Sequence, residues 1–447
     1  MIKRLIAVLL AAGCSSLYAQ QQANSRPIDK NIRNLKWSGF LRTRAWHLDS
    51  GSATSNGQTG SFNDGNVREL RTFQDLFFRN RFALTISPNI SINTLFDVGT
   101  LELGNDDGNR ETGSELGNPQ VKIRVKNVYF RFRPAKNSEI QAGLMPLSFP
   151  GGYILAKDGA AVKYQHRLLR GRVLPYALFI KAFENSSEDL NGNTVRNNNF
   201  NDFDIYAVGS KLAFGSSIKG ETYYIHSEDF NRFDSTINKT SPFILNWVGL
   251  HSQFLVGKFT IKVASILNWG FIQTNEATGV EPSKVNLTAG LWQGQVGYSF
   301  GNLVVSLLTE GATGDPANDR DRHSFQGISP SHGLTNILIA NDGGLQIRAG
   351  GNLYGLHGYG LKLEYVFLGE LSLNGSFVHF RGTRSVAGRG SLVGNELNMG
   401  AKYLGFEQIS FFFTGATFLP GGAYTNLVDN YRKRPIFEVM FGAQVNY

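Results

Sequence analysis

The stretch FEVMFGAQVNY, residues 437–447, alternates in character without a break and ends on an aromatic residue. Successive side chains of a β-strand point to opposite faces, so Phe437, Val439 and Phe441 share one face while Glu438 and Met440 share the other. A segment of this length suits one crossing of a bilayer by a tilted strand. The stretch predicts the last strand of an outer-membrane β-barrel, which closes by pairing with the first strand.

The N-terminal residues predict secretion. Lys3 and Arg4 precede a short apolar run, and the sequence LYA at residues 17–19 puts a small residue at the expected cleavage point. These features define a secretory signal peptide over residues 1–19. The sequence AAGC at residues 11–14 resembles a lipobox, so lipidation of Cys14 is the alternative.

The remaining chain is predicted to be one barrel over residues 36–447, preceded by a periplasmic leader over residues 20–35 that shows no periodicity. Cleavage after Ala19 removes the only cysteine, which excludes a disulfide framework. No stretch approaches the roughly 18 apolar residues of a transmembrane helix. Two or three soluble domains are the alternative for this length, but the alternation continues to the end without a change in composition.

Composition agrees with a barrel better than with a soluble α/β enzyme. Only 18% of the residues are charged, and 51 of the 447 are glycine. A barrel distributes its apolar residues over alternate positions, so its mean hydropathy stays mild. The formal net charge of +9 would suit anionic lipid or nucleic acid. Because the charge lies within strands and not in tails, we expect an anionic partner inside the barrel, contact with outer-membrane lipid, and no nucleic acid.

Short and long connections between strands alternate along the chain, and residues that favour turns dominate both kinds. The short ones lie at residues 87–89, 134–138, 169–171, 215–217, 256–258, 300–302, 368–370 and 404–407. The long ones lie at residues 49–69, 104–120, 148–156, 185–199, 227–241, 271–284, 311–356, 382–393 and 420–433. Short periplasmic turns that alternate with long outer loops are typical of bacterial barrels, and this set joins 18 antiparallel strands.

Residues 334–347 leave the number of strands open, because their apolar pattern would also suit an extra hairpin and hence 20 strands. We interpret them as part of loop 311–356, which we expect to fold into the lumen and narrow it. Aromatic residues near strand ends are predicted to form the girdles that lie at the lipid headgroups, namely Trp269, Trp292, Tyr298, Phe418 and Tyr447.

Cations recur on the polar phase of the early strands. Arg42 and Arg44 alternate with apolar or small residues, and Arg79 and Arg81 do so in the next strand. An Arg or Lys that faces lipid at mid-depth costs about 2–4 kcal/mol, so these side chains are expected to face the lumen. The predicted pore-lining cations are Arg42, Arg44, Arg79, Arg81, Lys122, Arg124, Arg131, Arg133, Lys163 and Arg167.

A phase change interrupts this pattern between residues 121 and 133. Lys122 and Arg124 alternate in one phase, whereas Arg131 and Arg133 alternate in the other. A β-bulge near Lys126–Asn127 would keep both sets inside, because a bulge inserts one extra residue into a strand.

The cationic set predicts an anion-favouring channel. Arginine binds planar oxyanions through paired hydrogen bonds, and rings of basic residues select anions. The alternative is that the cations pair with inward carboxylates and only brace the wall, and the predicted pore-lining acidic residues are Asp75, Asp97 and Glu396. Basic residues outnumber acidic ones on these strands, which favours the channel. A non-conducting barrel whose outer loops bind partners, as in an adhesin, is the alternative function.

A metal site and an enzyme active site have little support in the sequence. Asp315, Asp319 and Asp321 are weak calcium candidates in a polar loop, because their spacing does not match an EF-hand. The Ser–His neighbours at residues 323–324 and 331–332 do not make a catalytic triad, which is defined by geometry. We therefore expect no enzyme activity, no metal site and no cofactor.

At the level of pattern, the chain resembles the alginate-export family of outer-membrane proteins. The similarity lies in TEGATGD at residues 309–315, NELNMGAKY at residues 395–403 and FLPGG at residues 418–422. The resemblance implies an eighteen-stranded barrel, a monomer in preference to a trimer, with a basic lumen that passes an anionic polysaccharide or uronate.

Overall fold

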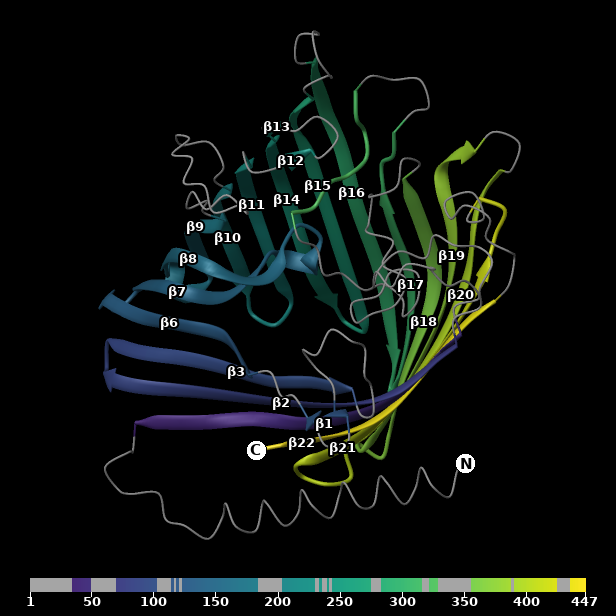
Figure 1. The fold of residues 1–447 in the computed structure, drawn as a ribbon, viewed down its shortest axis with the longest axis horizontal. Helices are drawn as coiled ribbons and strands as arrows, with labels where there is room; N and C mark the ends of the chain where they lie inside the picture. The colour runs from purple at the N-terminus through teal and green to yellow at the C-terminus, as the bar shows by residue number, and fades with distance from the viewer. Residues whose placement is uncertain are drawn as a thin grey trace.

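Eighteen antiparallel strands close into a barrel in the computed structural model of this chain (Figure 1). This confirms the predicted fold class and the count of 18. The structure describes residues 34–49, 70–102, 114–115, 118–119, 123–183, 203–229, 233–234, 239–240, 243–274, 283–315, 321–328, 355–386, 390–423 and 435–447. The predicted signal peptide and almost all of the predicted leader lie outside these residues. Among them, no helix has the length and apolar character needed to span a membrane.

The strands vary in length, and two short hairpins lie in outer loops. The barrel strands are β1 (Leu35–Asp49), β2 (Leu70–Ser87), β3 (Ile90–Glu102), β6 (Ile123–Ala135), β7 (Ser138–Ser148), β8 (Ala156–His166), β9 (Val173–Phe183), β10 (Phe203–Phe214), β11 (Ile218–Asp229), β14 (Phe243–Val256), β15 (Phe259–Thr274), β16 (Ser283–Phe300), β17 (Leu303–Ala312), β18 (Leu356–Phe367), β19 (Leu371–Val386), β20 (Gly390–Tyr403), β21 (Ile409–Pro420) and β22 (Ile436–Asn446). The small hairpins are β4 (Ser114–Glu115) with β5 (Asn118–Pro119) and β12 (Phe233–Asp234) with β13 (Lys239–Thr240).

The barrel closes between its first and last strands, as the C-terminal alternation predicts. β22 pairs antiparallel with β1 from Phe40 opposite Asn446 to Asp49 opposite Phe437. In Figure 1 the two strands lie side by side at the seam. Closure pairs the two edges that the first and last strands would otherwise expose, as hydrocarbon surroundings require.

All eight predicted short turns separate consecutive barrel strands, and all nine predicted long connections lie at the opposite ends. Several strands extend further into the long connections than the sequence suggests. β19 continues to Val386 and β20 begins at Gly390, although residues 382–393 carry many turn-forming residues. Backbone hydrogen bonds continue a hairpin beyond the hydrocarbon, where neither face of the strand contacts lipid. The side chains there need not alternate, so the sequence pattern does not mark these strand residues. The ambiguous residues 334–347 lie outside the described part of the chain.

Alternate side chains separate an apolar outer face from a mixed inner face. On β22, Phe437 and Val439 are exposed on the lipid side, while Ile436 and Glu438 are buried inside. Phe418 differs from its prediction, because it is fully buried on the inward phase of β21 and is not part of an outer girdle. Its ring occupies the space left open by Gly394 on the paired strand. This packing cannot be predicted from the position of Phe418 near the end of a strand.

Candidate functional site

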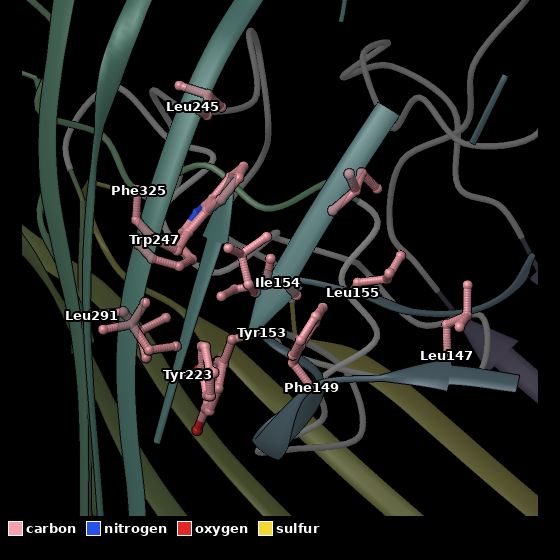
Figure 2. Packing of buried hydrophobic residues seen from close by; sticks show 14 of the residues in the cluster. Leu147, Phe149, Tyr153, Ile154, Leu155, Tyr223, Leu245, Trp247, Leu291 and Phe325 are labelled. Carbon is pink, nitrogen blue, oxygen red and sulfur yellow. The ribbon is translucent and has the colours of Figure 1, made fainter. Parts of the chain in front are cut away.

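Two segments outside the barrel strands pack into the lumen against one half of the wall. Residues 149–155 connect β7 with β8, and residues 321–328 belong to the long connection after β17. They join a buried cluster with inward residues of β9 to β17, and Figure 2 shows Tyr153, Ile154 and Phe325 of these segments beside Trp247 and Leu291 of the wall. Residues 321–328 of loop 311–356 therefore lie inside the barrel, as predicted.

Polar contacts hold both segments in place. The Tyr153 hydroxyl donates to Glu310 Oε2 at 3.0 Å, and the Trp247 indole N–H donates to the Gln326 carbonyl oxygen at 2.8 Å. The Ile328 N–H donates to the Ile154 carbonyl oxygen at 2.9 Å, which joins the two segments directly. Burial, and then the Glu310 carboxylate, raise the pKa of Tyr153, so its hydroxyl keeps the donated proton.

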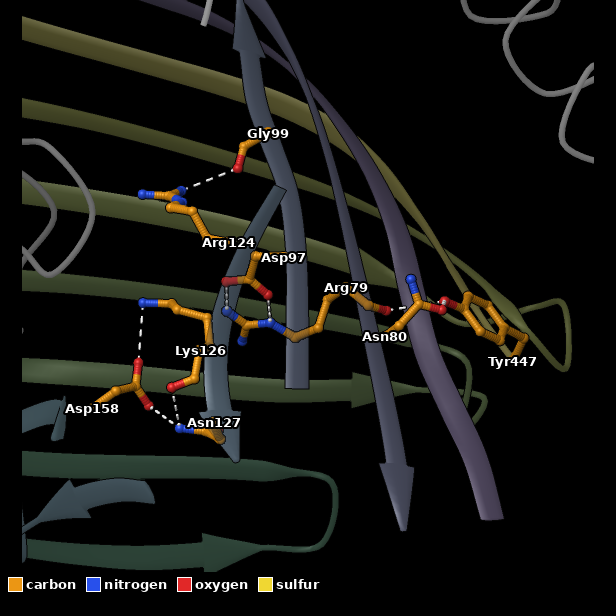
Figure 3. A network of polar contacts seen from close by, with 9 residues as sticks. All are labelled: Arg79, Asn80, Asp97, Gly99, Arg124, Lys126, Asn127, Asp158 and Tyr447. Carbon is orange, nitrogen blue, oxygen red and sulfur yellow. Dashed lines mark hydrogen bonds and ion pairs between the residues drawn. The ribbon is translucent and has the colours of Figure 1, made fainter. Parts of the chain in front are cut away.

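The opposite half of the lumen carries the predicted cations, beginning with two ion pairs. Arg44 binds both oxygens of Asp75, with its closest nitrogen at 2.7 Å, and both side chains are buried. Arg79 binds Asp97 through two hydrogen bonds of 2.7 and 2.8 Å (Figure 3). Paired, shielded charges of this kind brace the wall and offer little attraction to a solute.

A β-bulge brings the cations of β6 to the inner face. The pairing of β3 with β6 shifts register so that Leu95 lies opposite Asn127 while Phe96 lies opposite Val125. Lys126 is therefore the extra residue, at the predicted position. Lys126 forms an ion pair of 3.0 Å with Asp158, and Asn127 donates to the same carboxylate at 2.7 Å (Figure 3).

Further along β6, two guanidinium groups share one carboxylate. Arg131 lies 3.2 Å and Arg133 lies 3.0 Å from oxygens of Glu139 on β7. One anion cannot neutralise both cations, so this group carries a net positive charge into the lumen.

Three other cations have no carboxylate partner within the described part of the chain. Arg81 lies on the inward phase of β2 and is exposed to the lumen. Arg124 donates to the Gly99 carbonyl oxygen at 3.0 Å, and the Lys163 ammonium lies 5.5 Å from the centre of the Tyr176 ring. The contacts of Arg124 and Lys163 orient these side chains without pairing them with a carboxylate.

The structure places the remaining predicted residues as follows. Arg42 lies over the Phe77 ring on the inner face, and Glu396 is fully buried on the inward phase of β20. Arg167 differs from its prediction, because β8 ends at His166 and the arginine belongs to the periplasmic turn. Alternation alone does not reveal where a strand stops. Lys122 lies outside the described residues.

The described calcium candidates are engaged in local hydrogen bonds. Asp315 accepts the backbone N–H groups of His323 and Ser324, and Asp321 accepts that of Asn286 at 3.2 Å. Asp319 lies outside the described residues, among which no group of three or more possible metal ligands occurs. These aspartates hold the inserted segment against the wall.

The sequence predictions missed the anionic partners Glu139 and Asp158 and a second polar group. In that group the Tyr176 hydroxyl donates to Glu221 at 2.8 Å, and Lys211 lies 3.6 Å from the same carboxylate. Glu139, Tyr176, Lys211 and Glu221 occupy inward positions of their strands. Asp158 lies opposite Pro146, out of phase with the inward Lys163 of β8. Assigning inward phases to every strand, and not only to those rich in arginine, would have found most of them.

Comparison with known proteins identifies the architecture. No family model and no curated protein sequence matches the chain. Among solved structures, OccK8 (OprE) of Pseudomonas aeruginosa is similar with a TM-score of 0.57 and 14% identity, over 93% of this chain and 98% of its own. A BenF-like porin of Pseudomonas fluorescens Pf-5 is similar with a TM-score of 0.56 and 10% identity, over 93% and 99%.

OpdK of Pseudomonas aeruginosa, solved with vanillate, is similar with a TM-score of 0.54 and 12% identity, over 92% of this chain and 98% of its own. At these identities the likeness concerns the fold, which is that of an integral outer-membrane porin barrel. The outer-membrane barrel fold that the predicted resemblance implies is thus confirmed. The narrower resemblance to the alginate-export family stays a prediction.

Proposed function

We propose that this protein is an outer-membrane channel for passive diffusion of small anionic solutes. The observation that carries the proposal is the excess of cations over carboxylates on one half of the lumen. On the described part of β1 to β8, the carboxylates that form ion pairs are Asp75, Asp97, Glu139 and Asp158. The cations described above on the same strands are Arg42, Arg44, Arg79, Arg81, Arg124, Lys126, Arg131, Arg133 and Lys163. A channel wall with such an excess attracts anions and repels cations.

The geometry changes which of these residues should attract a solute. Arg44 and Arg79 are neutralised by buried aspartates. The residues that attract an anionic solute are therefore Arg81, Arg124 and the Arg131–Arg133 pair. Arginine suits carboxylates because its planar fork donates two parallel hydrogen bonds. Small carboxylates, including single uronate units, fit this proposal, and the vanillate in the structure of OpdK is a solute of the same charge type.

A polysaccharide fits the lumen less well than a small solute does. The segments 149–155 and 321–328 form a packed apolar cluster across part of the interior and are joined by a backbone hydrogen bond. A polymer in transit would need these segments to move aside along its whole length. We therefore favour small anions over the acidic polymer that the family resemblance implies.

Planar bilayer recordings test the proposal. In a potassium chloride gradient, the reversal potential of the wild-type protein should show preference for chloride, and Arg81→Gln with Arg124→Gln should weaken that preference. Lys284→Gln is the matched control, because Lys284 lies against Phe271 on the outward phase. Cation preference in the wild type, or equal reversal potentials for all three proteins, would contradict the proposal. Absence of any current would favour the adhesin-like alternative, for which the paired charges would serve only as braces.

A further inference from the structure

The turn between β8 and β9 is held in an unusual backbone conformation. Leu169, Arg170 and Gly171 have φ values of +48°, +58° and +86°. This region favours glycine, and a residue with a side chain is strained there. Leu169 is 68% exposed and its neighbour Leu168 is 44% exposed. The turn therefore presents an apolar pair and an arginine at the periplasmic rim despite an energetic cost.

Hydrogen bonds fix this turn to its neighbours. The Arg167 N–H donates to the Asn137 carbonyl oxygen at 2.8 Å, and the Ala213 N–H donates to the Arg172 carbonyl oxygen at 2.8 Å. The Leu255 N–H likewise donates to the Ser217 carbonyl oxygen at 2.7 Å. Four consecutive turns, from β6–β7 to β14–β15, therefore form one continuous stretch of the rim.

This stretch, which we call the basic rim, is strongly cationic. Its members are exposed and form no ion pair within the described part of the chain, and they are Lys136, Arg167, Arg170, Arg172, Lys219 and Lys258. On the far side of the barrel the turns carry carboxylates, Glu370 between β18 and β19 and Glu407 between β20 and β21. The basic turns thus lie on one side of the barrel and the turns with carboxylates on the other.

Exposed apolar residues lie directly beside the basic rim on the outer wall. Tyr164, Phe214, Ile218, Val256 and Phe259 are all exposed there, on the outward phase or at the ends of the strands. These side chains mark the edge of the lipid-facing band, so the cations lie at the depth of the phosphates in the periplasmic leaflet. A Lys or Arg close to an anionic membrane surface is attracted to the lipid phosphates.

We propose that the basic rim is a binding site for the headgroups of anionic phospholipids in the periplasmic leaflet. Arg167, Arg170 and Arg172 contact the phosphates, and Leu168 and Leu169 lie against the adjoining acyl chains. A lipid suits this surface better than a periplasmic protein for two reasons. The turns are short and fixed by backbone hydrogen bonds, and the site borders the lipid-facing wall directly.

Lipid binding to the purified, detergent-solubilised barrel tests the proposal. Native mass spectrometry and thermal unfolding would be measured with phosphatidylglycerol and with phosphatidylcholine of the same acyl chains. The wild type should prefer phosphatidylglycerol, and replacement of the three arginines by glutamine should lower that affinity by about tenfold to a hundredfold. Glu370→Gln with Glu407→Gln is the control on the far side and should leave the preference unchanged.

A second variant separates binding from folding. Arg170→Gly removes one charge and relieves the positive φ, so it should lower the preference for phosphatidylglycerol while its stability without lipid stays equal or rises. Equal binding of the two lipids by the wild type would overturn the proposal, as would an unchanged preference in the triple variant. Complete competition by inorganic phosphate at the same concentration would also overturn it, because a free ion does not need the adjoining leucines.

Discussion

The closure seam makes a quantitative prediction about Gly39. Tyr447 and Gly39 exchange backbone hydrogen bonds of 3.0 and 3.2 Å, and the Tyr447 ring extends across β1 toward β2. Its hydroxyl lies 3.0 Å from the Arg79 carbonyl oxygen and 2.7 Å from Asn80 Oδ1 (Figure 3). The Trp37 indole N–H donates to the same Asn80 oxygen at 3.0 Å, which explains a polar residue on the outward face of β2.

Replacement of Gly39 by alanine should disrupt this arrangement. A Cβ at residue 39 would collide with the Arg79 carbonyl oxygen and with the Tyr447 hydroxyl, so both the strand and the ring must shift. Overpacking of this kind costs about 1–3 kcal/mol. The lost hydroxyl hydrogen bond adds about 0.5–1.5 kcal/mol. We therefore expect Gly39→Ala to lower the free energy of unfolding by roughly 2–4 kcal/mol, and Tyr447→Phe by about 1 kcal/mol.

Urea unfolding in lipid vesicles, followed by tryptophan fluorescence, measures both values. Gly375→Ala is the matched control, because a Cβ at that outward glycine of β19 would meet only one atom, at 3.7 Å. The double variant Gly39→Ala/Tyr447→Phe should be less destabilised than the sum of its parts, since the added methyl group no longer meets a hydroxyl. A Gly39→Ala barrel as stable as the Gly375→Ala barrel would refute the reasoning.

Two further predictions concern the lumen. Tyr153→Phe removes the hydrogen-bond donor to Glu310 and should loosen segment 149–155. Single-channel recordings should therefore show larger or noisier currents than the wild type. An unchanged trace would mean that packing alone holds the segment. Asp97→Asn leaves the Arg79 guanidinium without its counter-ion, so bilayer reversal potentials should shift toward anions. Urea unfolding should show a loss of about 1–3 kcal/mol in the free energy of unfolding. A shift of the reversal potential toward cations would contradict this prediction.

Much of the prediction rests on side-chain alternation and turn preferences, which act locally. Alternation is informative because a strand in a membrane has only two faces and one of them contacts hydrocarbon. The alternation at Phe437 and Val439 predicts the closing strand, and the phase change at Lys126 predicts the bulge, since a cation on the wrong face would meet lipid. The eight turns follow from glycine, proline and asparagine, whose backbone preferences act within a few residues. None of this requires knowledge of distant contacts.

Alternation and turn-forming residues were thus enough to predict the barrel, its number of strands and the face on which the arginines of β1, β2 and β6 lie. Which of those arginines are neutralised depends on the complete fold, because Asp97 contacts Arg79, and Glu139 contacts Arg131, only through the register of adjacent strands. It also decided that residues 149–155 and 321–328 fill part of the lumen. Strand orientation is dictated by the solvent on each side, whereas ion pairing and loop insertion depend on groups that come together only when the cylinder is complete.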